Sequence, residues 1–160
     1  MKENTENIPE NKITLEQATS ADIKKCLEIE KGNGSKTYVF LADAAEVEEE
    51  MAKGPFYLIK KDSEIVGLVS YYMEKEDRAY ISGLSVDLKY KGQGIGRKAL
   101  EQVLSELENV PVVWLVTHPE NAGAVHLYES LGFKITGRKE NYFGDGEPRI
   151  ELTLTKEVTS

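Results

Sequence analysis

Apolar and polar residues alternate along this chain in two distinct rhythms, and each rhythm predicts a different kind of element. Apolar residues at every second position predict a strand with one buried face, as in residues 149–155. Apolar residues spaced by three and four predict a helix, as in residues 94–108. The apolar face of that helix must pack on a sheet, so the chain combines the two kinds of element in one core.

The predicted elements follow the order β-α-α-β-β-β-α-β-α-β-β along the chain. We therefore predict an α/β fold with a mixed, mostly antiparallel sheet of about six to seven strands, flanked by about four helices. The predicted strands are 12–18, 56–61, 64–73, 78–86, 112–116, 133–143 and 149–155, and the predicted helices are 20–31, 42–53, 94–108 and 121–131.

Glycine and proline mark several ends of these elements. Two glycines in 32–34 predict the end of the first helix, and the Gly-Pro pair at 54–55 predicts the end of the second. The Gly-Asp-Gly stretch at 144–146 predicts a hairpin turn between the last two strands. The continuous apolar run at 112–116 predicts a strand covered on both faces.

The length of 160 residues suits one domain with one core. We predict a single domain over residues 12–157, preceded by a polar, disordered lead-in over residues 1–11. That lead-in lacks the apolar stretch of a signal peptide, and no stretch elsewhere approaches the roughly 18 apolar residues of a membrane span. A soluble, cytoplasmic protein with no membrane partner is therefore expected.

Charge and cysteine content narrow the expected partners. The formal net charge is -8, with 28 acidic and 20 basic residues, which predicts no nucleic-acid partner. The single cysteine, Cys26, fits a reducing compartment, and its apolar surroundings favour a small buried hydrophobe over a nucleophile. His118 and His126, even together with Cys26, make no convincing set of ligands, so we predict no metal.

The densest chemical signal is the stretch LSVDLKYKGQGIGRKAL at residues 84–100. Glycine supplies unusual backbone angles, and a strand that turns into a helix aims free N–H groups and the positive end of the helix dipole at the turn. The stretch therefore predicts a phosphate site, with an ordinary glycine-rich connection as the alternative. It combines three glycines with four basic residues, namely Gly92, Gly94, Gly96, Lys89, Lys91, Arg97 and Lys98.

Two familiar phosphate loops fit this stretch poorly. A P-loop ends in Gly-Lys-Ser/Thr, whereas Gly96 is followed by Arg97-Lys98-Ala99. A dinucleotide fingerprint has Gly-x-Gly-x-x-Gly early in a βαβ unit, whereas this loop has Gly-x-Gly-x-Gly after a predicted antiparallel meander. Binding of NAD or ATP stays open as a competing hypothesis.

Gly83 interrupts the predicted strand 78–86 and predicts a bulge or a close backbone approach. If that strand splays from the strand at 112–116, the backbone groups of residues 84–86 become free. An amide-bearing ligand could then bond to them.

Two motifs in this chain resemble those of the Gcn5-related N-acetyltransferases. The stretch KGQGIG at 91–96 resembles the family's Arg/Gln-x-x-Gly-x-Gly/Ala loop for acetyl-coenzyme A, with Lys91 where Arg or Gln is usual. Lysine keeps the charge but loses the planar fork of arginine. The stretch NAGAVHLYESLGF at 121–133 is similar to the second motif, Asn-x-x-Ala-x-x-Leu-Tyr-x-x-Leu-Gly-Phe. The family's element order also matches the predicted one.

The resemblance implies a role for each matched residue. Leu84, Ser85 and Val86 would hold the pantetheine arm through their main chain, with the Val86 N–H polarising the thioester carbonyl. Asn121 would contact the same arm, and Tyr128 would protonate the departing coenzyme A thiolate. The pyrophosphate would be held by Lys91, Gly92, Gln93, Gly94, Ile95, Gly96 and Arg97.

Tyr128 has a second interpretation that rests on spacing alone. It shares one helical face with Ala124, Leu127 and Leu131, so its ring could simply pack in the core. A phenol is nevertheless protonated at neutral pH and able to donate to a forming thiolate. The residue that would deprotonate the acceptor amine is not assigned; the candidates near the expected acceptor cleft are Glu30, Glu74, Glu76, Tyr80, Tyr142 and Glu147.

The acceptor is open between two classes. The stretch RKENYF at 138–143, with Tyr142 at its aromatic position, resembles the part of the protein N-terminal acetyltransferase branch that lies near its peptide. That branch carries Glu where this chain has Val116, which counts against a peptide acceptor and keeps small amines as candidates.

The leading hypothesis is an acetyl-coenzyme A-dependent N-acetyltransferase acting on a primary amine, either a small amine or a peptide or protein N-terminus. The alternative is a non-catalytic module of the same fold that binds acetyl-coenzyme A as a sensor. A homodimer is plausible from the resemblance alone.

Overall fold

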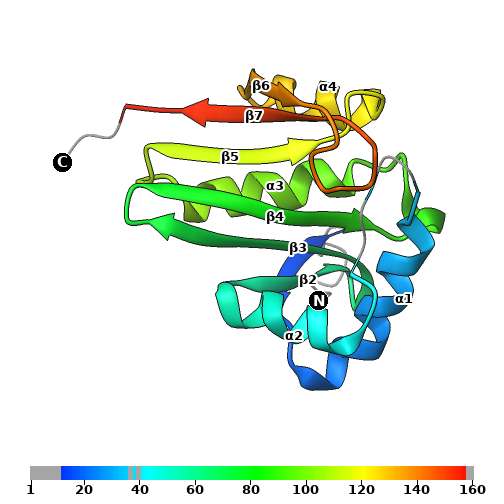
Figure 1. Ribbon diagram of the computed structural model, residues 1–160. Helices are drawn as coiled ribbons and strands as arrows, with labels where there is room; N and C mark the ends of the chain where they lie inside the picture. The colour runs from blue at the N-terminus through cyan, green and yellow to red at the C-terminus, as the bar shows by residue number, and fades with distance from the viewer. Residues whose placement is uncertain (1–11, 36–37, 39–40, 158–160) are drawn as a thin grey trace, which may run out of the picture.

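The computed structural model describes residues 12–35, 38 and 41–157 and shows one seven-stranded sheet with helices on both faces (Figure 1). The strand order is β1-β2-β3-β4-β5-β7-β6. Within these residues β4 and β5 run parallel, and every other pair of neighbouring strands is antiparallel. The predicted mixed, mostly antiparallel α/β fold is confirmed. The predicted lead-in over 1–11 lies outside the described residues.

The elements follow the predicted order, with two short 3₁₀ turns added. The strands are β1 (Ile13–Gln17), β2 (Phe56–Lys61), β3 (Glu64–Lys75), β4 (Arg78–Val86), β5 (Val112–Thr117), β6 (Lys134–Lys139) and β7 (Arg149–Thr155). The helices are α1 (Ile23–Asn33), α2 (Ala44–Lys53), α3 (Ile95–Glu106) and α4 (Ala122–Ser130), and the 3₁₀ turns are η2 (Ser20–Asp22) and η3 (Leu88–Tyr90).

The sheet separates two apolar cores. On the α3/α4 face, Leu100 and Val103 of α3 lie in one buried cluster with Val69 and Leu115 of the strands. On the α1/α2 face, Cys26 lies in a second buried cluster with residues of α2 and β2. Burying a side chain of this size contributes about 1.5–3 kcal/mol, so each face anchors its helices firmly. In Figure 1, α3 passes behind the sheet, while α1 lies at its right and α2 below it.

Cys26 is fully buried. Burial, together with the nearby Asp22 and Glu30 carboxylates, raises the pKa of its thiol to about 11. The thiol therefore stays protonated at neutral pH, and the interpretation of Cys26 as a small buried hydrophobe is confirmed.

Side-chain caps begin two of the helices. The Asp43 carboxylate accepts from the Glu46 N–H at 3.0 Å at the start of α2. The Asn121 side chain accepts from the Ala124 N–H at 3.3 Å at the start of α4. The predicted stop at Gly54 is confirmed, because a Cβ there would lie 2.6 Å from the carbonyl oxygen of Tyr71.

The predicted end of the first helix at Lys31 is wrong. α1 continues through Gly32 to Asn33, and Gly34, whose backbone is extended, ends it instead. The Asn33 side chain donates to the carbonyl of Ile29 at 3.1 Å, which adds a bond to the last turn. A single glycine inside a helix costs only about 1 kcal/mol, so Gly32 does not break it.

The predicted strand 133–143 is also too long, because β6 ends at Lys139. Asn141, Gly144 and Gly146 have positive φ values of 52°, 81° and 84°, which no regular strand can contain. The predicted three-residue hairpin turn is therefore the longer loop 140–148, called the β6–β7 loop below.

The prediction that strand 112–116 is covered on both faces is wrong as well. Val113, Leu115 and Thr117 of β5 are buried on the α3/α4 face, whereas Trp114 and Val116 are half-buried on the other. Trp114 stacks against Tyr80 of β4, with ring centroids 4.5 Å apart. Aromatic side chains, rather than a helix, cover this part of the sheet.

The bulge predicted at Gly83 is confirmed. Ser70 of β3 pairs with Gly83 while Tyr71 pairs with Ile81, which leaves Ser82 as the extra residue. The hydroxyls of Ser70 and Ser82 lie 2.8 Å apart. Beyond the bulge the apolar side chains of β4 again face the α3/α4 core.

Candidate active site

A cleft of about 1060 Å³ opens where β4 and β5 diverge. β4 and β5 pair at Arg78–Val112, Ala79–Val113 and Tyr80–Trp114, and their pairing ends there. The strands therefore splay, which meets the condition under which the backbone groups of residues 84–86 become free. Of the predicted site residues, all except Gln93 line this cleft, namely Leu84, Ser85, Val86, Lys91, Gly92, Gly94, Ile95, Gly96, Arg97, Asn121 and Tyr128.

Two parts of the cleft are built differently and are named here. The glycine-loop half comprises β4 from Leu84 to Val86, the loop 91–97 at the start of α3, and Asn121 and Tyr128 of α4. The β6–β7 half comprises the β6–β7 loop, Arg149, and the α1/α2 face of β4 and β5 around Tyr80 and Val116.

The backbone of β4 directs specific groups into the glycine-loop half. The Asp87 N–H donates to the Val66 carbonyl at 2.8 Å, and Ser85 pairs with Leu68 of β3. Because residues of an antiparallel ladder alternate in direction, the N–H groups of Leu84 and Val86 point away from β3, toward the gap beside β5. Of the three residues predicted to hold the pantetheine arm through their main chain, only Leu84 and Val86 therefore have an N–H group that faces the gap. The N–H group of Ser85 faces β3.

Asn33 is a residue of the cleft that sequence reasoning missed. Its Nδ2 donates to the Val86 carbonyl and to the Ser85 Oγ, both at 3.0 Å. Its Oδ1 is buried without a hydrogen-bond partner among the described residues. Asn33 thus ties the end of α1 to the diverging strand and occupies one of its carbonyls. The glycines on either side hid it, because they suggested a plain helix end.

The glycine loop has the unusual backbone that its sequence predicts. Gly92 and Gly94 have φ values of 83° and 76°, in the left-handed region that favours glycine, and a Cβ added at either would meet nothing within 4 Å. α3 begins directly after Gly94, at Ile95. The loop is therefore open to the cleft, and the first N–H groups of α3 lie beside it.

Polar contacts hold the basic side chains around this loop. Lys61 of β2 donates to the Gln93 side chain at 2.8 Å, which explains why Gln93 points out of the cleft. Arg97 donates to the Ser130 hydroxyl at 2.6 Å and pairs with Glu101 at 3.3 Å. These contacts fix the loop and α4 against each other while the positive charge stays near the start of α3.

Tyr128 packs in the core and also lines the cleft. Its ring belongs to the α3/α4 core and meets Phe133 edge-on at 6.0 Å, while the residue also lines the cleft. Burial raises the pKa of its hydroxyl to about 12. The hydroxyl is therefore a protonated donor at neutral pH, on a residue of the cleft wall.

The predicted base candidates separate by position. Glu74 accepts from the Trp114 indole at 2.8 Å and from Arg78 at 2.9 Å, outside the cleft, and Glu76 lies in the β3–β4 turn. Neither lines the cleft, whereas Glu30 and Tyr80 do. The Glu30 carboxylate is buried and accepts from the Tyr38 hydroxyl at 2.7 Å and the Leu41 N–H at 2.9 Å.

Burial raises the pKa values of two tyrosines of the β6–β7 half. It raises the pKa of Tyr80 well above its usual range, with Tyr142 and Tyr72 adding to the effect. It also raises the pKa of Tyr142, where the Glu151 carboxylate contributes next. All these hydroxyls are therefore donors at neutral pH.

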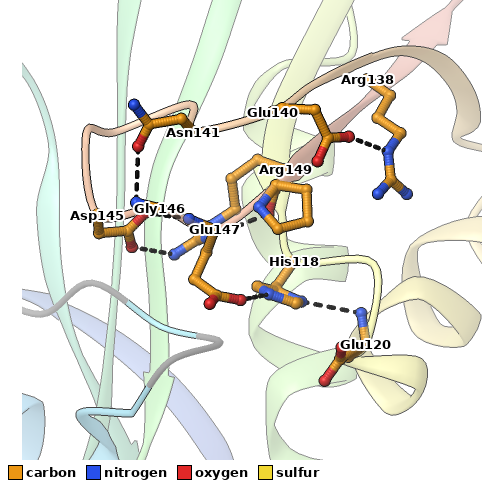
Figure 2. Close-up of polar contacts among 10 residues, drawn as sticks. His118, Glu120, Arg138, Glu140, Asn141, Asp145, Gly146, Glu147 and Arg149 are labelled. Carbon is orange, nitrogen blue, oxygen red and sulfur yellow. Dashed lines mark hydrogen bonds and ion pairs between the residues drawn. The ribbon is translucent and has the colours of Figure 1, made fainter.

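The β6–β7 loop is folded by its own polar contacts (Figure 2). Asn141 accepts from the Gly146 N–H at 2.6 Å, and Asp145 accepts from the Glu147 N–H at 3.0 Å. Glu147 reaches the fully buried His118, whose Nε2 lies 2.8 Å from its carboxylate. The Glu120 N–H donates to His118 Nδ1 at 3.0 Å, so the ring proton sits on Nε2 and is donated to Glu147.

Two findings concern other kinds of site. Over 12–35, 38 and 41–157, no group of three His, Cys, Asp or Glu side chains is placed to hold a metal ion. The same residues contain no helix that is long and apolar enough to cross a membrane.

Comparison with known proteins agrees with the motifs. Residues 23–133 match the model of the acetyltransferase (GNAT) family. The [ribosomal protein bS18]-alanine N-acetyltransferase of Escherichia coli (strain K12) is 42% identical over 80 residues, which are 49% of this chain and 54% of that protein. The N-acetylaspartate synthetase of Homo sapiens is 34% identical over 124 residues, 72% of this chain and 39% of that protein. The chain thus spans about half or less of the length of these relatives.

Solved structures share the fold at lower identity. The ribosomal-protein-S18-alanine N-acetyltransferase from Escherichia coli superposes with a TM-score of 0.79 at 23% identity, covering 93% of this chain and 97% of that one. Arabidopsis thaliana Naa50, in complex with the bisubstrate analogue CoA-Ac-MVNAL, gives a TM-score of 0.77 at 22% identity, covering 90% and 99%. At such identities the likeness shows the fold.

Proposed function

The chain belongs to the acetyltransferase (GNAT) family, and from that premise we propose that it transfers an acetyl group from acetyl-coenzyme A to a primary amine. The observation that carries this proposal is the divergence of β4 and β5 directly beside the glycine loop. It leaves backbone donors free for an extended, amide-bearing arm, with an anion site at its end. The similar Escherichia coli protein that is named an N-acetyltransferase supports the same reaction.

The residues of the glycine-loop half fit such a donor. The open backbone at Gly92 and Gly94 and the N-terminus of α3 suit a pyrophosphate, and Lys91 and Arg97 add positive charge. The N–H groups of Leu84 and Val86 suit the amides and the thioester oxygen of the arm. Asn121 lines the same cleft at the start of α4.

The proposed chemistry is direct attack of the amine on the thioester carbonyl. The Val86 N–H stabilises the oxyanion that forms, because a fixed backbone donor needs no reorganisation. The Tyr128 hydroxyl gives its proton to the departing thiolate, and its raised pKa keeps that proton available at neutral pH. Attack, oxyanion stabilisation and protonation then occur within one cleft.

The proton acceptor for the amine is proposed to be Glu30. Val116 stands where the peptide N-terminal branch carries Glu, and Tyr80 stays protonated because its pKa is raised. Glu30 lines the cleft and accepts from the Tyr38 hydroxyl, which also contacts Ser85. A proton leaving the amine would pass to the Tyr38 oxygen as the Tyr38 proton passes to Glu30. Tyr38→Phe should then slow acetylation while acetyl-coenzyme A still binds.

The first test is thermal unfolding with saturating acetyl-coenzyme A, with NAD and ATP as comparison ligands. A ligand at 100 times its dissociation constant adds about 2.7 kcal/mol to the stability of the native state. Selective stabilisation by acetyl-coenzyme A supports the proposal, and an amine panel then tests turnover. Tight binding without acetylation of any amine would favour the sensor alternative, and stabilisation by NAD or ATP alone would overturn the proposal.

Localisation and domain extent follow as secondary proposals. We propose that residues 12–157 act as one acetyltransferase domain, because both cores and the whole cleft are built from this stretch. A reducing, cytoplasmic environment suits the single buried Cys26.

A further inference from the structure

Arg149 is a buried cation in the β6–β7 half of the cleft. It is the first residue of β7, its side chain is 2% exposed, and it lines the cleft. Ile150 and Leu152 of the same strand lie in the α3/α4 core, so alternation turns Arg149 to the opposite face. β7 pairs with β5 at Ile150–Thr117 and at Glu151–Val116, which places Arg149 on the same face as Val116, beside the divergence of the strands.

Among the residues that the structure describes, the guanidinium has few hydrogen-bond acceptors. An arginine carries five N–H donors. In the described part of the chain, Nη1 donates to the Pro148 carbonyl at 3.0 Å and Nη2 donates to Asp145 Oδ2 at 3.1 Å (Figure 2). The Asp145 side chain is 33% exposed, and its other oxygen accepts from the Glu147 N–H. A buried cation is therefore balanced by one oxygen of a partly solvated carboxylate.

Phe143 lies over this cation. Its ring centre is 5.2 Å from the guanidinium carbon, yet 48% of the residue is exposed, and it too lines the cleft. An aromatic ring over a cation leaves the edges of the guanidinium free for hydrogen bonds in its plane. It also keeps water away, which strengthens a charge pair formed beside it.

We propose that Arg149 binds a carboxylate of the acceptor, so that the preferred amine carries an acidic side chain on the same residue. This inference rests on the proposed acetyl transfer. A carboxylate matches the guanidinium fork and accepts two parallel N–H bonds from it, which supplies the partners that the protein leaves out. The acidic residue has two sources, a free acidic amino acid or the first residue of a peptide.

The test compares acceptors that differ by one charge. The free pair is L-aspartate and L-asparagine, and the peptide pair is Asp-Ala-Ala-Ala amide and Asn-Ala-Ala-Ala amide. The wild-type protein should show a kcat/KM about tenfold or more higher for the Asp member of at least one pair. The pair that shows the preference identifies the source. Equal kcat/KM values within both pairs would overturn the proposal.

Variants separate recognition from folding. Arg149→Gln should bring the ratio close to one by lowering kcat/KM for the Asp member, and Arg149→Lys should keep part of the preference. Asp145→Asn removes the carboxylate that competes for Arg149 and leaves Arg149 itself in place. It should raise the ratio of kcat/KM between the Asp and Asn members. The matched control is Arg138→Gln, an exposed arginine paired with Glu140, which should leave the ratio unchanged. If Arg149→Gln does not fold, the Asp145→Asn variant decides.

A binding measurement distinguishes this inference from the proposed function. Calorimetry on the protein saturated with coenzyme A gives the dissociation constant of each acceptor without turnover. Tighter binding of the Asp member without any acetylation would support the role of Arg149 and count against catalysis. Acetylation of both members at equal rates, with equal binding, would support catalysis and overturn the role of Arg149.

Discussion

The two halves of the cleft are held in place by different means. The glycine-loop half is made mainly by the backbone of two nearby stretches, 84–86 and 91–97, with free N–H groups, two left-handed glycines and the start of one helix. The β6–β7 half is made by side chains from distant positions, such as His118 with Glu147 and Tyr80 with Trp114. A site built from backbone geometry tolerates changes in side chains, whereas a site built from side-chain pairs can change its preference one residue at a time.

The largest effect is expected from Tyr128→Phe, which removes the proposed acid of the glycine-loop half. Turnover should fall by about 100- to 1,000-fold, or about 2.7–4 kcal/mol, because the thiolate then leaves without a proton. Acetyl-coenzyme A affinity should not change. Steady-state kinetics and calorimetry measure the two quantities.

The matched control is Tyr71→Phe. Tyr71 is also a buried tyrosine of the α3/α4 core, but its hydroxyl donates to Glu106 at 2.9 Å. Turnover should stay near that of the wild type. A fully active Tyr128→Phe protein would remove Tyr128 from the mechanism and leave its ring as core packing alone.

Alkaline unfolding should show the cost of the same buried hydroxyl. The pKa of Tyr128 is raised to about 12 in the native state, against about 10 in an unfolded chain. The native state therefore holds the proton more tightly. Its advantage is complete below pH 10 and is lost as the pH rises toward 12, by about 2–3 kcal/mol.

The difference in unfolding free energy between wild type and Tyr128→Phe isolates this effect from other alkaline titrations. Denaturant titrations from pH 9 to 12 should show the wild type losing stability faster than the variant. Parallel curves for the two proteins would contradict the assigned burial of the Tyr128 hydroxyl.

Glu147→Ala tests the side-chain pairing of the β6–β7 half. It leaves the buried Nε2–H of His118 without its acceptor, which should cost about 1–3 kcal/mol of unfolding free energy. The acceptor KM should rise, while acetyl-coenzyme A affinity should stay the same. Glu140→Ala is the control, because Glu140 is an exposed partner of Arg138 and its loss should cost less than about 1 kcal/mol. Equal effects of the two variants would mean that the His118 contact does not hold the loop.

The smallest expected effect compares glycines from the two halves. Gly94→Ala and Gly144→Ala each place a Cβ in open space at a φ near 80°, so both should lose about 1–2 kcal/mol. Only Gly94→Ala should weaken acetyl-coenzyme A binding, by about tenfold in the dissociation constant. If both variants weakened acetyl-coenzyme A binding equally, the binding role would not be confined to the glycine-loop half.

The same division decides what the sequence could predict. The order of elements, the Gly83 bulge and the conformation of the glycine loop follow from local patterns, and the structure agrees with each. Local patterns do not predict three other features, namely the extension of α1 to Asn33, the length of the β6–β7 loop and the half-buried face of β5. They depend on contacts between residues far apart in the chain, such as Asn33 with Val86 and Trp114 with Tyr80.

Arg149 illustrates the limit most clearly. In the sequence it is an arginine in an alternating strand, where a solvated side chain is the ordinary expectation. Its burial comes from the folding of the β6–β7 loop back over the strand, with Phe143 above it and Asp145 at its edge. No local pattern signals that return, because the glycines of the loop allow many conformations.

The bulge at Ser82 and Gly83 gives the donor backbone an unusual vulnerability to changes in chain length. A substitution at either position alters one side chain. Deleting one residue there would reverse the direction in which each following residue of β4 points. Leu84 and Val86 would then exchange orientations with their neighbours, burying their N–H groups against β3 and turning their apolar side chains away from the α3/α4 core. At this bulge the number of residues therefore matters more to the donor site than which residues they are.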